Sequence, residues 1–438
     1  MGSFFNEIAY GFRQGGFFPL SVSFFDLASL LFLVATVAYL VYLASRREAS
    51  WKIGFAAAFA GMLFQTLALA FRWIAAGWDH PPFTNLYESL VFFGWGIALV
   101  YIVVEIKYRV KIAGAFVFPL TFIAMGIASL SPNKAIEPLI PALQDIWLHL
   151  HVITASVGYA AFLVAFGFSL LYLIKDRLRL EYMGVALCLF MVFAATAVTR
   201  GKVFLMVFEM TRVVMHGDAF FHAPGGSGPA RLEIPGAGAL LFVCMLSYLV
   251  TAVYLLIAAR SDRPTTTRTG FSLFAGSFIL LSILLVHIPI ASARMPEVTL
   301  RADIYSFAML LVCWFLSMIL LIVRWRHEEI LEILPDAKTL DRLSYRSIMV
   351  AFPIMTLVIV TGAVWANKAW GRYWGWDPKE TASLVTWIIY LLYLHTRITS
   401  GWSGRRAAFI SIIGFVSVVF TYLGVNLVIS GLHSYATG

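Results

Sequence analysis

Charged side chains are scarce in this sequence. Asp, Glu, Lys and Arg make up 13% of its 438 residues, whereas hydrophobic residues make up 61%. Soluble globular domains carry roughly 25% charged residues, so the composition excludes an ordinary water-soluble fold. The mean hydropathy of +0.85 points the same way. We therefore expect lipid to surround most of this chain.

Cysteine is also rare. Cys188, Cys244 and Cys313 lie inside apolar stretches, and the sequence contains no C-x-x-C pair. The chain therefore carries no dithiol redox motif and no thiolate metal cluster of its own. Any thiol chemistry must belong to a partner or to a substrate.

Long apolar stretches recur along the whole chain. Each is close to the roughly 20 residues that a helix needs to cross about 30 Å of hydrocarbon. They predict an all-α fold, a polytopic transmembrane helical bundle of about 12 spans. The expected spans are 22–44, 53–73, 88–106, 112–130, 152–174, 182–199, 237–259, 270–290, 305–323, 347–366, 381–397 and 407–430.

The basic residues predict the orientation of these spans, because short cytoplasmic loops collect Lys and Arg. Basic clusters fall in alternate loops, for example around 46–52, 107–111 and 397–406. One assignment satisfies all of them, and it places both termini on the outer, periplasmic side. The net charge of +9 is then mostly a signal of membrane topology. We therefore expect membrane lipid, and no nucleic acid, among the partners.

Two longer connecting segments receive structural interpretations. Residues 200–236 contain the run APGGSGP and are expected to be part loop and part interfacial helix. Residues 324–346 mix acidic and basic side chains and are expected to form a solvated amphipathic connector.

The most informative stretch is WANKAWGRYWGWDPKETASLVTWIIYLLYLHTR, residues 365–397. Trp370, Trp374 and Trp376 crowd into seven residues beside Asp377, at the outer mouth of two helices. Tryptophan favours the membrane interface in any case, but an ordinary aromatic belt is distributed over many helix ends. The concentration in one loop suits a flat, apolar, polarizable ligand.

This stretch resembles the tryptophan-rich WWD signature of haem-handling membrane proteins. The letters WGRYWGWDPKE followed by YLHTR are most similar to the CcsA (ResC) family, the channel subunit of the System II cytochrome c synthase. Four further stretches match that family in the same order. They are PPFTNLYESLVFFGW ending at Trp95, PALQDIWLHLHV ending at Val152, LDRLSYR before the tryptophan stretch, and GLHSY near the C-terminus.

The resemblance implies a haem site on the outer side. His151 and His433 match the two external histidines that ligate the haem iron, and both are expected at the depth of the tryptophan loop. From the residues alone, a pair of axial imidazoles is only one alternative. Trp370, Trp374 and Trp376 would contact the porphyrin. Asp377 is also expected at the haem site, where it orients the loop or a proton donor at the haem edge; the alternative is that it caps the helix that follows.

A second haem position is implied at His395. This residue is eighteen residues beyond Asp377, which places it up to about 27 Å away on a helix, near the inner side. The family resemblance implies that it ligates haem in transit from the cytoplasm, with the opposing ligand supplied by the partner protein CcsB (ResB). The alternative is a snorkelling histidine hydrogen-bonded near Arg397.

For several other polar residues the expected roles are less specific. Arg372 or Lys379 pairs with the haem propionates or anchors the loop. His80 is expected to be a loop residue, and His149 to point away from the direction of His151. His287 is expected near the outer end of its span, beside a polar group.

The resemblance also divides the chain. We expect N-terminal transmembrane helices at 1–175 that include His151, inserted helices at 176–323 that shorter members of the family lack, and haem-handling helices at 324–438.

The implied function is transport of haem b across the membrane, followed by its covalent attachment, with CcsB, to the CxxCH motif of apocytochrome c on the outer face. This is a holocytochrome-c synthase type of lyase. An upstream thiol-reducing protein is an expected partner. The expected location is the bacterial inner (plasma) membrane, in preference to a thylakoid-type membrane. The alternative is a haem exporter or chaperone without synthase activity, while scarce mid-membrane carboxylates disfavour an ion-coupled transporter.

Overall fold

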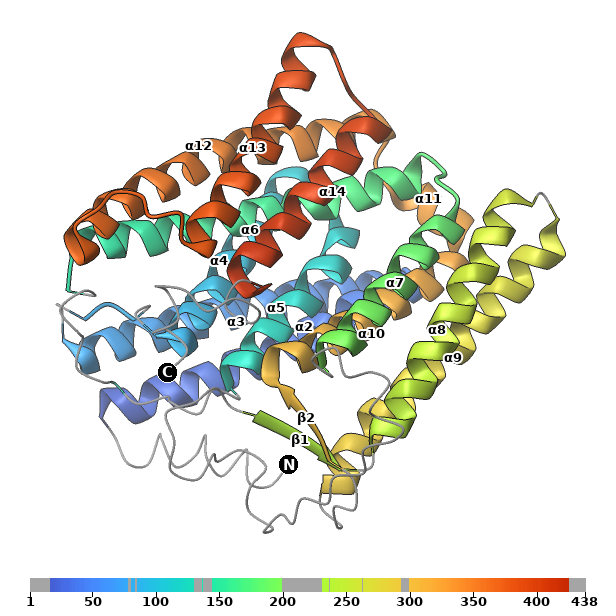
Figure 1. Cartoon of the computed structure of the whole chain (residues 1–438), viewed down its shortest axis with the longest axis horizontal. Helices are drawn as coiled ribbons and strands as arrows, with labels where there is room; N and C mark the ends of the chain where they lie inside the picture. The colour runs from blue at the N-terminus through green and yellow to red at the C-terminus, as the bar shows by residue number, and fades with distance from the viewer. Residues whose placement is uncertain are drawn as a thin grey trace. The chain divides into compact units, whose positions relative to one another are not determined.

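The structure is a computed structural model, and it is almost entirely helical (Figure 1). It describes residues 16–424 except 78–79, 83–84, 130–135, 137–143, 199–230, 236, 262 and 293–298. Contacts divide the chain into two compact units. One combines Met1–Asp176 with Leu331–Gly438, and the other is Arg177–Ile330.

In the described residues of the first unit there are eight long helices. They are α2 (Phe17–Ser45), α3 (Glu48–Ala76), α4 (Leu86–Tyr108), α5 (Gly114–Ser129), α6 (Ile146–Lys175), α12 (Ala337–Trp370), α13 (Pro378–Thr399) and α14 (Arg405–Val419). A short π-helical turn, Phe420–Gly424, continues α14.

Helix ends in this unit follow the local sequence. Asn85, Asp145, Asp336 and Asp377 precede α4, α6, α12 and α13, and each side chain accepts a hydrogen bond from a backbone N–H of the first turn. Such caps satisfy donors that a helix start leaves unpaired. Gly371 ends α12 in the left-handed conformation, which glycine adopts without a Cβ clash.

Helices α6, α12, α13 and α14 pack as a group of four (Figure 1). Helix α6 contacts α12 and α14, and α13 contacts both of those helices in turn. The rings of Phe166 in α6 and Phe415 in α14 stack at 4.6 Å. The hydroxyls of Ser169 in α6 and Ser344 in α12 lie 2.9 Å apart. The tryptophan loop joins α12 to α13 at one end of this group.

The second unit is built from α7 (Leu180–Val198), α8 (Ala237–Arg260), α9 (Pro264–Ser292) and α10 (Ile304–Trp325). Helix α11 (His327–Ile333) follows, and it crosses the boundary between the units. Two short strands, β1 (Arg231–Pro235) and β2 (Thr299–Asp303), pair antiparallel, which the sequence analysis did not predict. The three cysteines are buried in α7, α8 and α10 with free thiols.

The polytopic helical fold is confirmed. Every expected span falls on a helix as far as the structure describes it, and ten of the described helices are long and apolar enough to cross a membrane. Helix α7 is a shorter apolar helix, and α13 is less apolar than the other spans. The connector expected at 324–346 is largely helical, because α11 and the first turns of α12 occupy it. The outer placement of the termini remains a prediction.

Candidate functional site

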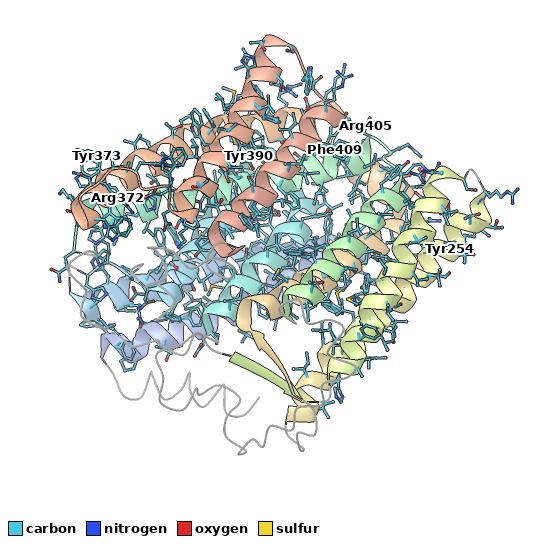
Figure 2. The ribbon with its side chains drawn as sticks, viewed as in Figure 1. Tyr254, Arg372, Tyr373, Tyr390, Arg405 and Phe409 are labelled. Atoms are coloured by element: carbon cyan, nitrogen blue, oxygen red, sulfur yellow. The ribbon has the colours of Figure 1, made fainter. Side chains whose placement is uncertain are left out.

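The tryptophan loop lies between the end of α12 and the start of α13. Figure 2 shows Arg372 and Tyr373 there, at one end of these two helices. Tyr373 is exposed, and the Arg372 guanidinium lies so close to Gly375 that a Cβ on that glycine would be 2.6 Å from it. Gly375 therefore allows Arg372 to fold back over the loop.

Trp376 is the most exposed tryptophan of the loop. The residue is 70% exposed, and its backbone has a φ of 57°, in the left-handed region that a bulky residue rarely adopts. This conformation costs about 1–2 kcal/mol. The indole of Trp376 meets that of Trp374 edge to face, with centroids 5.9 Å apart. The loop thus holds an exposed indole in a strained backbone, a combination found at ligand-binding sites.

Glu380 holds the backbone on both sides of Trp376. Its Oε2 accepts hydrogen bonds from the N–H of Gly375 at 2.7 Å and from the N–H of Asp377 at 3.1 Å. The Asp377 side chain accepts in return from the first turn of α13, which completes a capping box with Pro378 at the first helical position. Of the two roles expected for Asp377, the structure therefore supports helix capping.

Lys379 follows in the same turn, before the expected span 381–397. Burial lowers the pKa of its ammonium group to about 8, while the charge of Asp377 acts in the opposite direction. Its charge is therefore sensitive to pH in a range where an ordinary lysine stays fully protonated.

His151 lies in the second turn of α6 and faces α12. Its Nδ1 is 2.8 Å from the carbonyl oxygen of Val358, so Nδ1–H donates and the lone pair of the ring is placed on Nε2. Metal-binding histidines commonly donate their second nitrogen to a carbonyl in this way. Gly362 makes room for the ring, because a Cβ there would lie 2.8 Å from Nδ1.

A row of aromatic rings leads from His151 to the tryptophan loop. The imidazole stacks on the buried indole of Trp365, with centroids 6.3 Å apart and planes 18° apart. Trp365 then meets Trp370 edge to face at 4.9 Å. The structure thus joins His151 through Trp365 to Trp370, the last residue of α12 before the loop.

An ion pair ties the start of α6 to the end of α12. Nζ of Lys368 lies 2.8 Å from Oδ2 of Asp145. Burial raises the pKa of the Asp145 carboxyl, but the hydrogen bonds from Lys368 and the Trp147 N–H outweigh it and hold the pKa below its usual value. The carboxylate therefore stays charged, and the contact fixes the two helix ends that carry His151 and the tryptophan loop.

His395 lies elsewhere, close to the far end of α13. Its side chain is exposed, among exposed apolar residues that include Leu391 and Leu392. The nearby Arg397 makes a bidentate ion pair with Asp341 of α12. Both expected roles of His395, a ligand of haem in transit and a snorkelling histidine near Arg397, stay predictions.

The remaining histidines have mixed outcomes. His433 lies outside the described residues, so its expected ligand role stays a prediction. His80 is a loop residue, as expected, but it is buried and acts electrostatically on His149 of α6. His287 is half-buried in α9.

Three contributors to the site were missed by the sequence reasoning. Val358 acts through a backbone carbonyl, which no residue pattern reveals. Gly362 lies in a helix without any turn signal, and its role depends on a neighbouring helix. Glu380 could have been predicted, because Asp377 followed three residues later by Glu380 matches the capping-box pattern.

The fold and this geometry define a class: a multi-pass helical membrane protein that presents a histidine and a loop of tryptophans at one end of a helix group. The family model described as "Cytochrome C assembly protein" matches residues 83–214 and 236–433.

Curated relatives match over most of the chain. The cytochrome c biogenesis protein CcsA of Gloeobacter violaceus is 34% identical over 413 residues, covering 92% of both chains. CcsA of Trichormus variabilis is 32% identical over 392 residues, covering 86% of this chain and 87% of that protein. A solved chain, cytochrome c heme lyase CcmF, is 12% identical with a TM-score of 0.33, covering 96% of this chain and 73% of that one, and supports no inference.

The chain belongs to the cytochrome c assembly protein family, and its resemblance to CcsA proteins is confirmed over most of its length. It is a multi-pass membrane protein with a role in cytochrome c maturation. The matched ranges include His151, His395, His433 and the whole tryptophan loop.

Proposed function

We propose that this protein carries haem b from the inner side of the membrane to the tryptophan loop and, with a CcsB (ResB) type subunit, attaches it to the CxxCH motif of apocytochrome c. The observation that carries the proposal is the setting of His151. Its ring packs against Gly362 and is oriented by a hydrogen bond to the Val358 carbonyl. It also stacks on Trp365, which lies between His151 and the loop.

These residues suit haem as a substrate. The donated Nδ1–H leaves Nε2 of His151 in the form that binds iron. The exposed indole of Trp376, with Trp374 beside it and Trp370 farther back, offers apolar surface for a porphyrin face. His433 would supply the second axial imidazole.

The attachment step needs no oxidant or reductant. The histidine of CxxCH replaces one axial ligand, and each cysteine thiol then adds across a haem vinyl group. The sulfur bonds to one vinyl carbon and the thiol proton ends on the other, so atoms and electrons balance. Both cysteines must arrive reduced, which is the task of an upstream thiol-reducing protein. The chain's contribution is to position the haem and its substrate.

The proposed partner subunit would bind beside His395. A histidine on an exposed, mostly apolar helix face is costly in lipid unless a ligand or another protein covers it. We propose that haem is held there between His395 and a histidine of the CcsB-type subunit before it moves outward. The membrane would be the bacterial inner membrane.

The proposal is tested by purifying the chain with a CcsB-type subunit and a CxxCH peptide. We expect bound haem and thioether formation on the peptide. Haem binding without thioether formation would leave the haem exporter as the function. Folded complex without haem under conditions of raised haem synthesis would contradict both.

A further inference from the structure

The inner part of α12 carries an exposed row of basic side chains. Lys338, Arg342 and Arg346 succeed one another at intervals of four residues, and all three are exposed. Residues at this spacing share one face of a helix. Among the described residues the ion pairs nearby use other cations, such as Arg397 with Asp341. We call these three residues the basic stripe.

The packing shows which way the stripe faces. On α12, Ser344 contacts α6, whereas Asp341 and Thr356 contact α13. Arg342 and Arg346 are one residue and five residues beyond Asp341, which turns them by about 100° and 140° from it, away from the α6 side. The stripe therefore points to the side of α12 opposite α6.

His395 faces the same side. On α13, Thr386 contacts Thr421 beyond α14, and the ring of Tyr390 lies against Gly414 of α14. His395 is five residues beyond Tyr390, on the opposite side of the helix from α14. Because α6 and α14 pack against each other, the faces of α12 and α13 directed away from them lie on one side of the unit.

The stripe and His395 also lie at the same depth. Arg397 is paired with Asp341, and Trp387 donates to the Thr356 hydroxyl, which together fix the antiparallel register of α12 and α13. His395 is two residues before Arg397, about 3 Å along the axis. It therefore lies between the levels of Asp341 and Arg346.

Resting on the function proposed above, we infer that Arg342 and Arg346 bind the two propionates of the haem held at His395. A haem on this face would lay its porphyrin over exposed apolar residues such as Leu391 and Met349. Its carboxylates would turn toward the inner surface, where the guanidiniums lie. Guanidinium groups match carboxylates in geometry as well as in charge. Arg397 is not available for this role, since Asp341 engages it.

Anionic lipid headgroups are the competing occupant, because basic residues at the inner surface also attract them. The test therefore uses the full chain with its CcsB-type subunit in nanodiscs of zwitterionic lipid. The outer site is removed by His151→Gly, so that binding reports the inner site. Ferric haem is compared with haem dimethyl ester, which has no propionate charge.

The double variant Arg342→Gln, Arg346→Gln should weaken haem binding about tenfold and leave dimethyl ester binding unchanged. Arg342→Lys, Arg346→Lys keeps the charge and should restore most of the haem affinity. The matched control is Arg406→Gln, which removes an exposed basic residue of α14 whose guanidinium lies over the Trp402 ring, and it should have no effect.

An equal loss for both porphyrins, or no loss for either, would overturn the inference. So would a loss that is absent in zwitterionic nanodiscs and appears only when the measurement is repeated with anionic lipid added to them, because the occupant would then be a headgroup. His395→Gly separates this result from the proposed function. It should weaken binding of both porphyrins, and if it changes neither, the inner haem position itself is wrong.

Discussion

The imidazole of His151 lies against Gly362, and no larger residue fits at that position with the ring in place. A Cβ on Gly362 would be 2.8 Å from Nδ1 and 2.9 Å from Cε1 of the imidazole. The two residues are far apart in the sequence, and only the pairing of α6 with α12 brings them together.

Gly362→Ala should therefore displace the His151 ring and break its hydrogen bond to Val358. Overpacking of this kind costs about 1–3 kcal/mol, which corresponds to a loss of outer-site haem affinity of about fivefold to 150-fold. Haem titration of the purified protein, followed by absorption, measures it.

Gly167→Ala is the matched control, because Gly167 is also helical and a Cβ there meets nothing within 4 Å. It should bind haem as the unmodified protein does. Normal haem affinity and an unchanged spectrum in Gly362→Ala would show that the contact between His151 and Gly362 does not matter for haem binding.

Glu380→Ala should loosen the tryptophan loop. It removes the acceptor that holds the N–H groups of Gly375 and Asp377 around the strained Trp376. Loss of such a cap costs about 1 kcal/mol, so amide exchange in residues 371–377 should quicken roughly fivefold and haem affinity should fall by a similar factor. Glu380→Gln keeps an acceptor oxygen, so its amide exchange and haem affinity should lie between those of the unmodified protein and those of Glu380→Ala.

The control for this variant is Glu328→Ala, which removes an exposed carboxylate paired with Arg177. It should leave exchange in the loop unchanged. Protection of Gly375 and Asp377 that survives Glu380→Ala would assign the loop conformation to another cause.

Lys379 predicts a pH dependence of haem binding at the outer site. Its pKa of about 8 is below the ordinary value for lysine, so its charge is present below pH 8 and is lost as the pH rises through 8. If the ammonium pairs with a propionate, haem affinity should fall over that range. Lys379→Arg, which stays charged, should remove the dependence. The same decline in Lys379→Arg would assign the titration to another group.

Much of this molecule could be predicted from its sequence, because lipid imposes simple rules. A helix that crosses hydrocarbon must be long and apolar, so each span is visible in the local composition alone. The helix start at Asp377 was visible for a similar reason, since an acidic cap followed by proline is a local signal. The start of α12 at Ala337 was missed because its first turns are polar and resemble a connector.

The site was predictable only where one residue carries the chemistry. Histidine and tryptophan identify themselves, and the family resemblance assigned them. The position of the His151 ring depends instead on Gly362 and on the carbonyl of Val358, both on another helix. These contacts exist only after α6 and α12 have packed. The strained backbone of Trp376 could not be predicted either, because no residue type in the sequence marks a left-handed conformation at a tryptophan.

The most direct test of the account is the absorption spectrum of the chain purified with its CcsB-type subunit. We expect haem b with two imidazole ligands, and we expect that His151→Gly and His433→Gly each lose outer-site haem and regain it when imidazole is supplied. Full haem occupancy with an unchanged bis-imidazole spectrum in both variants, with no response to imidazole, would contradict the assignment of the outer site.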